Sequence, residues 1–315
     1  MAVAARVNPK TYFSPDEWAR LSHHSSWKGI ALVVHCYAVI GLAAAMAMVW
    51  PITIPLAVMI IGCRQLGLGI LGHDAAHGAL HPNLKINDWV AKTFTGGGLD
   101  AYRAYHLKHH KFAQQAEDPD LVLSAPFPIT RTSLRRKMIR DLTGQTYFKA
   151  RMSGTQKALK ARKPGESFLP VLSAFWKQNG KLILGGALFT AVGAPFGYWW
   201  AWLALWLLPR ATWNALVTRL RNIAEHACIP VNEPDPLRQA RTTMSNLFER
   251  ALIAPYWVNY HCEHHMFMHV PCYNLPLAHR LLKAKNVTPG MLIAPGYWDV
   301  ISQAASKPDK VLAAA

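Results

Sequence analysis

Apolar residues are concentrated in two long stretches of the chain. Residues 29–71 contain one charged side chain, that of Arg64, and residues 182–208 contain none. Prolines just after position 50 and a Gly-Ala-Pro sequence at 193–195 interrupt the two stretches. A helix needs about 20 apolar residues to cross the roughly 30 Å hydrocarbon core of a bilayer, so each stretch can form two helices and a tight turn. The pattern therefore predicts four transmembrane helices in two hairpins, near residues 29–49, 52–72, 182–197 and 199–217.

The composition agrees with membrane-spanning helices. Of the 315 residues, 51% are hydrophobic and only 16% are charged. Five tryptophans lie near predicted helix ends, where amphipathic rings favour the membrane interface: Trp27, Trp50, Trp199, Trp200 and Trp213. The alternative is a pair of helices buried in a soluble protein. It is less favoured, because two uncharged runs of this length are rare in soluble folds.

The basic residues predict the orientation of these helices. The net charge is +17, yet both predicted hairpin turns lack Lys and Arg. Since Lys and Arg favour the cytoplasmic side of a membrane, we expect the other three regions to lie there, in the inner membrane of a bacterium. The expected fold is an all-α membrane protein with a single domain over 1–315, made of a cytosolic segment 1–28, a hairpin 29–72, a cytosolic segment 73–181, a hairpin 182–217 and a cytosolic segment 218–315. No nucleic-acid partner is expected, because the chain lacks a recognisable binding module.

Histidines recur at helical spacing in the segments predicted to be cytosolic. Three boxes read HDAAH, HLKHH and HCEHH, and they contain His73 and His77, then His106, His109 and His110, and finally His261, His264 and His265. Asn222 and His226 form one more pair four residues apart. Residues three and four apart lie on one face of a helix, so each box can direct its rings to a common point. Their joint pattern is strong, whereas a single HxxxH would be weak.

Nine histidines are more than one metal ion needs. Structural zinc takes four ligands, and catalytic zinc takes three and a water. The number suits two ions with four or five nitrogens each, and imidazole by itself suits iron, copper and zinc alike. Asp74, Glu225 and Glu263 adjoin these histidines. They are either partners that fix the ring tautomers or simple carboxylates on a helix surface.

The boxes, together with EDPDL after the second and NYHCEHHMFMHVPCYNLP around the third, resemble those of the integral-membrane fatty acid desaturase and hydroxylase superfamily. The resemblance covers roughly residues 70–280. It implies four membrane helices beneath a cytosolic helical cap, and two iron ions as cofactors. It also implies that the eight histidines of the boxes, together with His226, are the iron ligands, with Asn222 approaching one iron through water.

The resemblance also implies an activity, the O2-dependent desaturation of a fatty acyl chain of a membrane lipid. The chain has no cytochrome-b5-type haem motif and no CxxC iron–sulfur spacing, so we expect a separate electron donor, ferredoxin-like or cytochrome-b5-like. The first box is HxxxH, whereas acyl-CoA members of the family have one more residue between the histidines, which favours acyl-lipid substrates. The alternatives are a diiron hydroxylase or ketolase acting on a carotenoid or sphingolipid and, in another class, a zinc-dependent hydrolase or metal-handling protein.

Two further stretches of sequence need an interpretation. Residues 131–163 hold eleven basic side chains and one acid, which favours contact with anionic lipid headgroups over the alternative of docking an acidic electron donor. Residues 67–72, GLGILG, fit a nucleotide-binding pattern, but they lie inside a predicted membrane helix. Small residues there are better explained by close helix packing.

Overall fold

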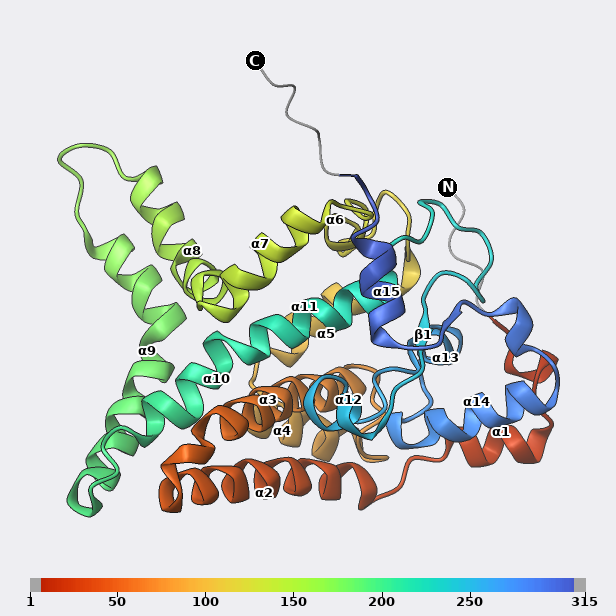
Figure 1. Cartoon of the computed structure of the whole chain (residues 1–315), viewed down its shortest axis with the longest axis horizontal. Coiled ribbons are helices and arrows are strands. Elements are labelled where there is room, and N and C mark those ends of the chain that lie inside the picture. The colour runs from red at the N-terminus through yellow and green to blue at the C-terminus, as the bar shows by residue number, and fades with distance from the viewer. Residues whose placement is uncertain (1–6, 309–315) are drawn as a thin grey trace. The chain divides into compact units, whose positions relative to one another are not determined.

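The computed structural model describes residues 7–308, which are mostly helical (Figure 1). The longer helices are α1 (Pro15–Ser22), α2 (Lys28–Val49), α3 (Ile54–Ala76), α4 (Leu84–Phe94), α5 (Leu99–Lys111), α7 (Arg131–Leu142), α8 (Gln145–Ala161), α9 (Leu169–Gly193), α11 (Trp213–His226), α14 (Leu275–Ala284) and α15 (Tyr297–Ala304). The short ones are α6 (Leu121–Ser124), α10 (Leu208–Ala211), α12 (Leu247–Leu252) and α13 (His261–Met266). A small parallel pair of strands, β1 (Thr242–Thr243) and β2 (Ile293–Ala294), was not part of the all-α prediction.

Internal contacts divide the chain into two compact units. The first contains the described residues up to 38, residues 63–135 and residues from 217 on. The second contains residues 39–62 and 136–216. Neither unit is a continuous segment, and the single domain over 1–315 stays a prediction.

The first predicted hairpin agrees with the structure. Among the described residues, two helices are long and apolar enough to cross a membrane, Lys28–Val49 with a mean hydropathy of 2.2 and Pro51–Ala76 with 1.8. One residue, Trp50, separates them. The second helix continues to Ala76, four residues beyond its expected end, so it carries the start of the first histidine box.

The second predicted hairpin is helical on both sides of its turn, but its bounds differ from the prediction. Helix α9 begins at Leu169 rather than near 182, because the mixed apolar and polar residues 169–181 also adopt helix. The turn falls at Ala194–Phe196 as expected, with Gly197 at φ 79°. The returning arm is broken into a π-helical turn at Leu203–Leu207, then α10 and α11. Whether this hairpin crosses a membrane stays a prediction.

Within the second unit, α8 packs against α9 through polar contacts. Arg151 Nε donates to Asn179 Oδ1 at 3.1 Å, and the backbone N–H of Gly154 donates to Gln178 Oε1 at 3.1 Å. An added Cβ at Gly154 would lie 2.8 Å from that same Gln178 oxygen, so the small residue permits the approach. The beginning of the basic segment 131–163 forms α7, and its remainder forms α8 and the residues after it.

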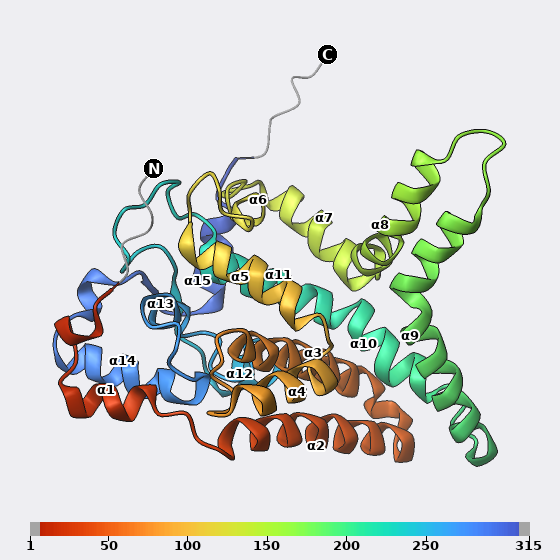
Figure 2. The same cartoon turned by 180° about the vertical axis from the view of Figure 1, so that it is seen from behind.

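The first unit brings distant segments side by side around the histidines. Helices α5 and α11 run next to each other, and α13 lies near them (Figures 1 and 2). Behind α13, helix α14 packs against α1, where Asn274 Nδ2 donates to the carbonyl of Leu21 at 2.9 Å. Leu21, Ile223 and Leu282 are completely or almost completely buried and form part of this core.

The GLGILG sequence lies within α3 and packs closely, as predicted. A Cβ added to Gly67 would lie 2.6 Å from the ring of Tyr256, and one added to Gly72 would lie 2.7 Å from Thr95 Oγ1. The middle glycine, Gly69, has nothing within 4 Å of such a Cβ. Two of the three glycines are therefore required by the packing, and no nucleotide is needed to explain them.

Candidate metal centre

The nine histidines of the predicted ligand set form two compact groups. The first group contains His73, His77, His106, His110 and His264, and the second contains His109, His226, His261 and His265. In each group the ligand-capable nitrogens lie within 4.8 Å of one another. Every one of these residues is buried or nearly so. Five and four nitrogens correspond to the number expected for two ions.

The two groups cut across the sequence boxes. On α5, His106 and His110 join the first group and His109 joins the second. On α13, His261 and His265 belong to the second group, while His264 belongs to the first. Residues four apart are rotated by about 40° around a helix, whereas residues three apart are rotated by about 60° the other way. The second and third boxes therefore each serve both groups, whereas His73 and His77 of the first box both belong to the first group.

The distances within the groups fit a shared cation. His106 Nε2 lies 3.0 Å from His77 Nε2 and 3.0 Å from His110 Nε2. A ring nitrogen is either a donor or an acceptor, so one Nε2 placed between two others cannot be explained by a chain of hydrogen bonds. Two nitrogens bound at right angles to one metal, with bonds of about 2.1 Å, would be about 3.0 Å apart. Converging lone pairs of this kind suit a metal ion.

The same arrangement recurs in the second group. His226 Nε2 lies 3.0 Å from His261 Nε2, which in turn lies 3.2 Å from His265 Nε2. His109 Nε2 completes the group at 3.3 Å from His265 Nε2. All four residues present Nε2, which leaves Nδ1 free for contacts with the surrounding protein.

Burial keeps these imidazoles neutral. It lowers the pKa of seven of them well below the usual value, and neighbouring histidine charges lower it further: His77, His106, His110, His226, His261, His264 and His265. A neutral imidazole offers the lone pair that a metal requires. The environment therefore favours the protonation state in which these residues can act as ligands.

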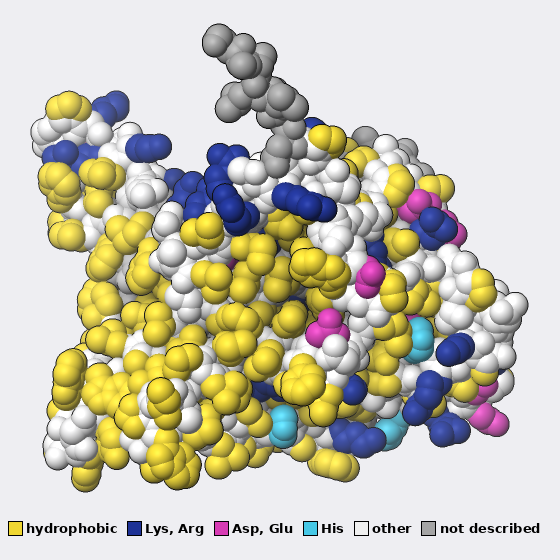
Figure 3. Space-filling model, viewed as in Figure 1, with side chains coloured by type: hydrophobic (Ala, Val, Ile, Leu, Met, Phe, Trp, Pro, Cys, Tyr) yellow, Lys and Arg dark blue, Asp and Glu magenta, His cyan; other side chains and the backbone are white. Residues whose placement is uncertain are grey.

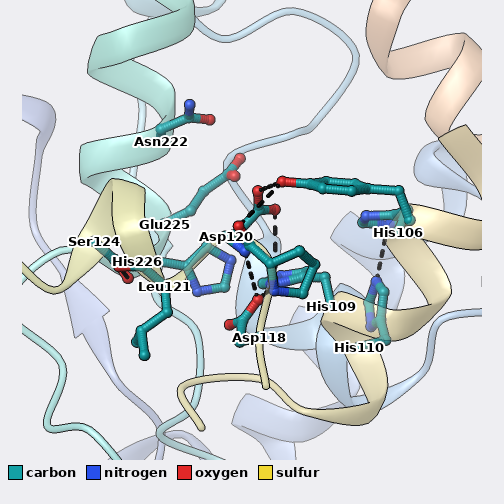
Figure 4. Close-up of polar contacts among 12 residues, drawn as sticks. His106, His109, His110, Asp118, Asp120, Leu121, Ser124, Asn222, Glu225 and His226 are labelled. Carbon is teal, nitrogen blue, oxygen red and sulfur yellow. Dashed lines mark hydrogen bonds and ion pairs between the residues drawn. The ribbon is translucent and has the colours of Figure 1, made fainter. Parts of the chain in front are cut away.

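Asp118 orients one of the rings, and the sequence analysis did not identify it. Its Oδ1 lies 2.8 Å from His109 Nδ1, and both side chains are almost completely buried (Figure 4). The carboxylate also accepts from the backbone N–H groups of Gln114 at 3.0 Å and Asp120 at 2.8 Å. A carboxylate on Nδ1 fixes the tautomer that leaves Nε2 for a metal. Asp118 lies in the EDPDL sequence, and the resemblance of that sequence to the family was the feature that could have identified it.

The three predicted carboxylates are buried, so the interpretation as helix-surface groups is wrong. Asp74, Glu225 and Glu263 are 4%, 3% and 0% exposed. Glu225 Oε2 lies 3.3 Å from His261 Nε2, and its other oxygen accepts from Arg221 Nε at 2.5 Å. Glu225 is therefore the one of the three in direct contact with the Nε2 of a grouped histidine.

Asp74 and Glu263 have other partners. Asp74 Oδ2 accepts from the backbone N–H of Cys272 at 2.8 Å, and its other oxygen is 3.8 Å from His73 Nδ1. Glu263 Oε1 lies 2.5 Å from His279 Nδ1, and Thr242 Oγ1 donates to its other oxygen. These two carboxylates connect the histidine helices to neighbouring segments.

Asn222 lies on α11, one turn before His226 (Figure 4). It lines a small cavity of about 40 Å³ together with His226, His261 and Glu225. The cavity has room for about one water molecule. This position agrees with an approach to a metal through water, although the role itself stays a prediction. Within residues 7–308, neither group contains the histidines that the spacing set aside, His81, His269 and His279.

A larger cavity of about 450 Å³ reaches both groups, because its lining includes His110 of the first and His265 of the second. Apolar side chains make up most of the rest, among them Trp18, Leu107 and Phe267. The residues before and within α1 form one wall, where Trp18 lies 5.8 Å from Phe267, measured between ring centroids. An apolar ligand in this cavity would contact the rings of both groups at once.

Comparison with known proteins agrees with this site. A family model described as fatty acid desaturase matches residues 48–294. The dihydrorhizobitoxine desaturase of Bradyrhizobium elkanii is 23% identical over 78% of this chain and 71% of its own length. The chloroplastic omega-6 fatty acid desaturase of Glycine max is 24% identical over 85% of this chain and 65% of its own length.

Proposed function

Because this chain belongs to the fatty acid desaturase family, we propose that it is an O2-dependent desaturase that introduces a double bond into a fatty acyl chain of a membrane lipid. The observation that carries the proposal is the division of nine buried histidines into groups of five and four. One group would supply an ordinary metal site. Two adjacent groups, built only from neutral nitrogen donors, suit a pair of redox-active ions.

Iron is the metal that fits the reaction. Removing hydrogen from an unactivated methylene requires a strong oxidant, which a pair of iron ions can supply with O2, whereas zinc has no accessible redox state. In this proposal the nine histidines hold the ions, and Asp118 fixes His109 in the ligating tautomer. Asn222 would hold a water in the small cavity beside His226. Glu225 Oε2 lies 3.3 Å from His261 Nε2, the nitrogen that would bind the metal, so this carboxylate would face the ion held by the second group.

The larger cavity supports an acyl substrate. Its apolar lining favours a hydrocarbon chain over a polar molecule. The part of the acyl chain that would react is the part beside His110 and His265, which line the cavity. One named relative is an omega-6 fatty acid desaturase, and the other is named for dihydrorhizobitoxine. The two helices that are long and apolar enough to cross a membrane support a lipid substrate taken from the bilayer. We place the histidines on the cytoplasmic side of a bacterial inner membrane.

The reaction needs a separate electron donor. Desaturation removes two hydrogen atoms from the acyl chain, and two external electrons complete the reduction of O2 to water. The chain has neither a haem motif nor an iron–sulfur spacing, so we propose a ferredoxin-like or cytochrome-b5-like protein. The basic segment 131–163 carries mostly exposed Lys and Arg side chains and would contact either lipid headgroups or this donor.

Expression in a host that lacks the activity tests the proposal. Mass spectrometry of the host lipids should show acyl chains that have lost two hydrogens, and the purified protein should contain about two irons per chain. The variant His265→Ala should abolish the product, whereas His23→Ala, at an exposed histidine outside both groups, should not. A gained oxygen instead of a double bond would indicate a hydroxylase or ketolase. One zinc per chain would refute the proposal.

A further inference from the structure

Helix α12 has an exposed apolar surface that the site does not use. Leu247 and Phe248 are 72% and 77% exposed, and they follow one another at the start of the helix. Hydrophobic side chains gather in the region around α12 (Figure 3). Two large apolar side chains exposed together on a short helix indicate a contact surface.

The position of α12 relative to the first membrane helix follows from two contacts. Tyr256, four residues after α12, has its hydroxyl 3.1 Å from His35 Nδ1. His35 lies seven residues after Lys28, the first residue of α2, which corresponds to about 10 Å along a helix. The segment after α12 is therefore held against the part of α2 that is expected inside the membrane.

Arg64 provides the second contact, and it lies within the helix Pro51–Ala76. Its Nη2 donates to the carbonyl of Arg250 at 3.2 Å and to that of Ala251 at 2.9 Å, at the C-terminal end of α12. The backbone carbonyl of Arg64 accepts from Cys36 Sγ at 3.2 Å, which places Arg64 beside α2 one residue further than His35. The contacts of Tyr256 and Arg64 therefore place the C-terminal end of α12 at the same level along α2, beside His35 and Cys36.

Several backbone groups at both ends of α12 have partners within the protein. At the start, Asn246 Oδ1 accepts from the N–H of Glu249 at 2.9 Å, and Glu249 Oε2 accepts from the N–H of Asn246 at 2.8 Å. At the end, Arg64 supplies the donors that the last carbonyls need. A helix end in contact with lipid must have its polar groups satisfied in this way, because hydrocarbon offers no partner. A buried Arg in a membrane helix is costly. The hydrogen bonds from the Arg64 guanidinium to the end of α12 explain why the chain has one at this position.

We propose that α12 is a membrane-surface helix, and that Leu247 and Phe248 insert among the lipid acyl chains on the cytoplasmic side. The exposed Arg250 lies on the same helix and can extend to the headgroups. Helices of this kind bury their apolar face about 5–10 Å below the boundary between headgroups and acyl chains. The inference depends only on the membrane position of α2 and α3 and not on the proposed reaction. It changes the expectation that all of residues 218–315 lie in the cytoplasm.

Site-directed spin labelling tests this placement. Four of the five cysteines are buried and Cys228 is partly exposed, so Cys228→Ser gives a suitable parent. Single cysteines at Leu247 and Phe248 would carry the label, with the purified full-length protein in phosphatidylcholine vesicles. The lipid reference is Val34→Cys, next to His35 and 62% exposed. The water reference is Lys283→Cys, on the exposed side of α14.

The measured quantity is the ratio of collisions with O2, which concentrates in hydrocarbon, to collisions with a water-soluble nickel chelate. We expect the ratio at positions 247 and 248 to exceed that at Lys283→Cys by about the same factor as at Val34→Cys. A ratio at both positions equal to that at Lys283→Cys would overturn the proposal and leave this surface for a protein partner. The two positions are labelled in separate proteins, so failure of one variant to fold still leaves the other as a test.

Discussion

The contact between Glu263 and His279 gives the sharpest test of how the third histidine box is held in place. Glu263 lies on α13 between grouped histidines and has no exposed surface, and its carboxylate contacts the ring of His279 on α14, with Nδ1 and Oε1 2.5 Å apart. The variant His279→Ala leaves the carboxylate buried with Thr242 as its remaining side-chain partner. Removing one member of a buried pair costs about 3–5 kcal/mol, and because Thr242 stays we expect the lower end, about 3 kcal/mol.

For a chain of 315 residues the entropy of unfolding is about 0.66 kcal/mol/K, so about 3 kcal/mol corresponds to a decrease of roughly 4–5 °C in unfolding temperature. Differential scanning fluorimetry of the protein in detergent measures it, with all variants heated at one rate. The matched control is His23→Ala at an exposed site, which should change the free energy of unfolding by no more than about 0.5 kcal/mol. The double variant Glu263→Gln, His279→Ala removes the unpaired charge and should recover part of the loss. If His279→Ala and His23→Ala behave alike, the pair does not hold α13, and the reasoning is refuted.

Three further predictions follow from the packing and the charges. Asp118→Asn replaces one carboxylate oxygen by an NH2 group, which faces either the N–H of Gln114 or both His109 Nδ1 and the N–H of Asp120, so His109 is held less firmly and metal affinity should fall about 10–100-fold in a competition with a chelator; unchanged affinity would remove Asp118 from its orienting role. Gly67→Ala forces a methyl group against the Tyr256 ring and should destabilise by about 1–3 kcal/mol, whereas Gly69→Ala should be tolerated; equal effects would contradict the close packing. The metal-free protein should lose stability as the pH falls below about 6.5, because its buried histidines have lowered pKa values and the unfolded chain then binds more protons; a flat unfolding-temperature profile between pH 7.5 and 5.5 would contradict the burial of neutral rings.

Local spacing carried most of what could be predicted from the sequence. The apolar run after Gly29 predicted a helical hairpin, and the spacing of the boxes predicted which histidines share a helix. The resemblance to the desaturase family is confirmed by the family comparison. These features depend on residues close together in the chain, where helical periodicity applies.

Contacts between distant segments were beyond that reasoning. The partner of Glu263 is sixteen residues away on another helix, and Asp118 reaches His109 only because the chain turns back after α5. The second hairpin was predicted as two regular helices, yet its returning arm contains a π-helical turn before Pro209. Its cause is local backbone geometry around a proline, which hydropathy does not register.

The division of the histidines also determines when the metal centre can be assembled. The second group draws two of its four members from α13, and until that helix has been synthesised only His109 and His226 are present. The first membrane hairpin leaves the ribosome about 190 residues earlier than His264. In the proposed diiron protein, the hairpin can therefore enter the membrane before the second group is complete, and the chain must be made as far as His265 before both ions can bind. The order of the boxes along the chain therefore sets the order in which the two groups can be completed.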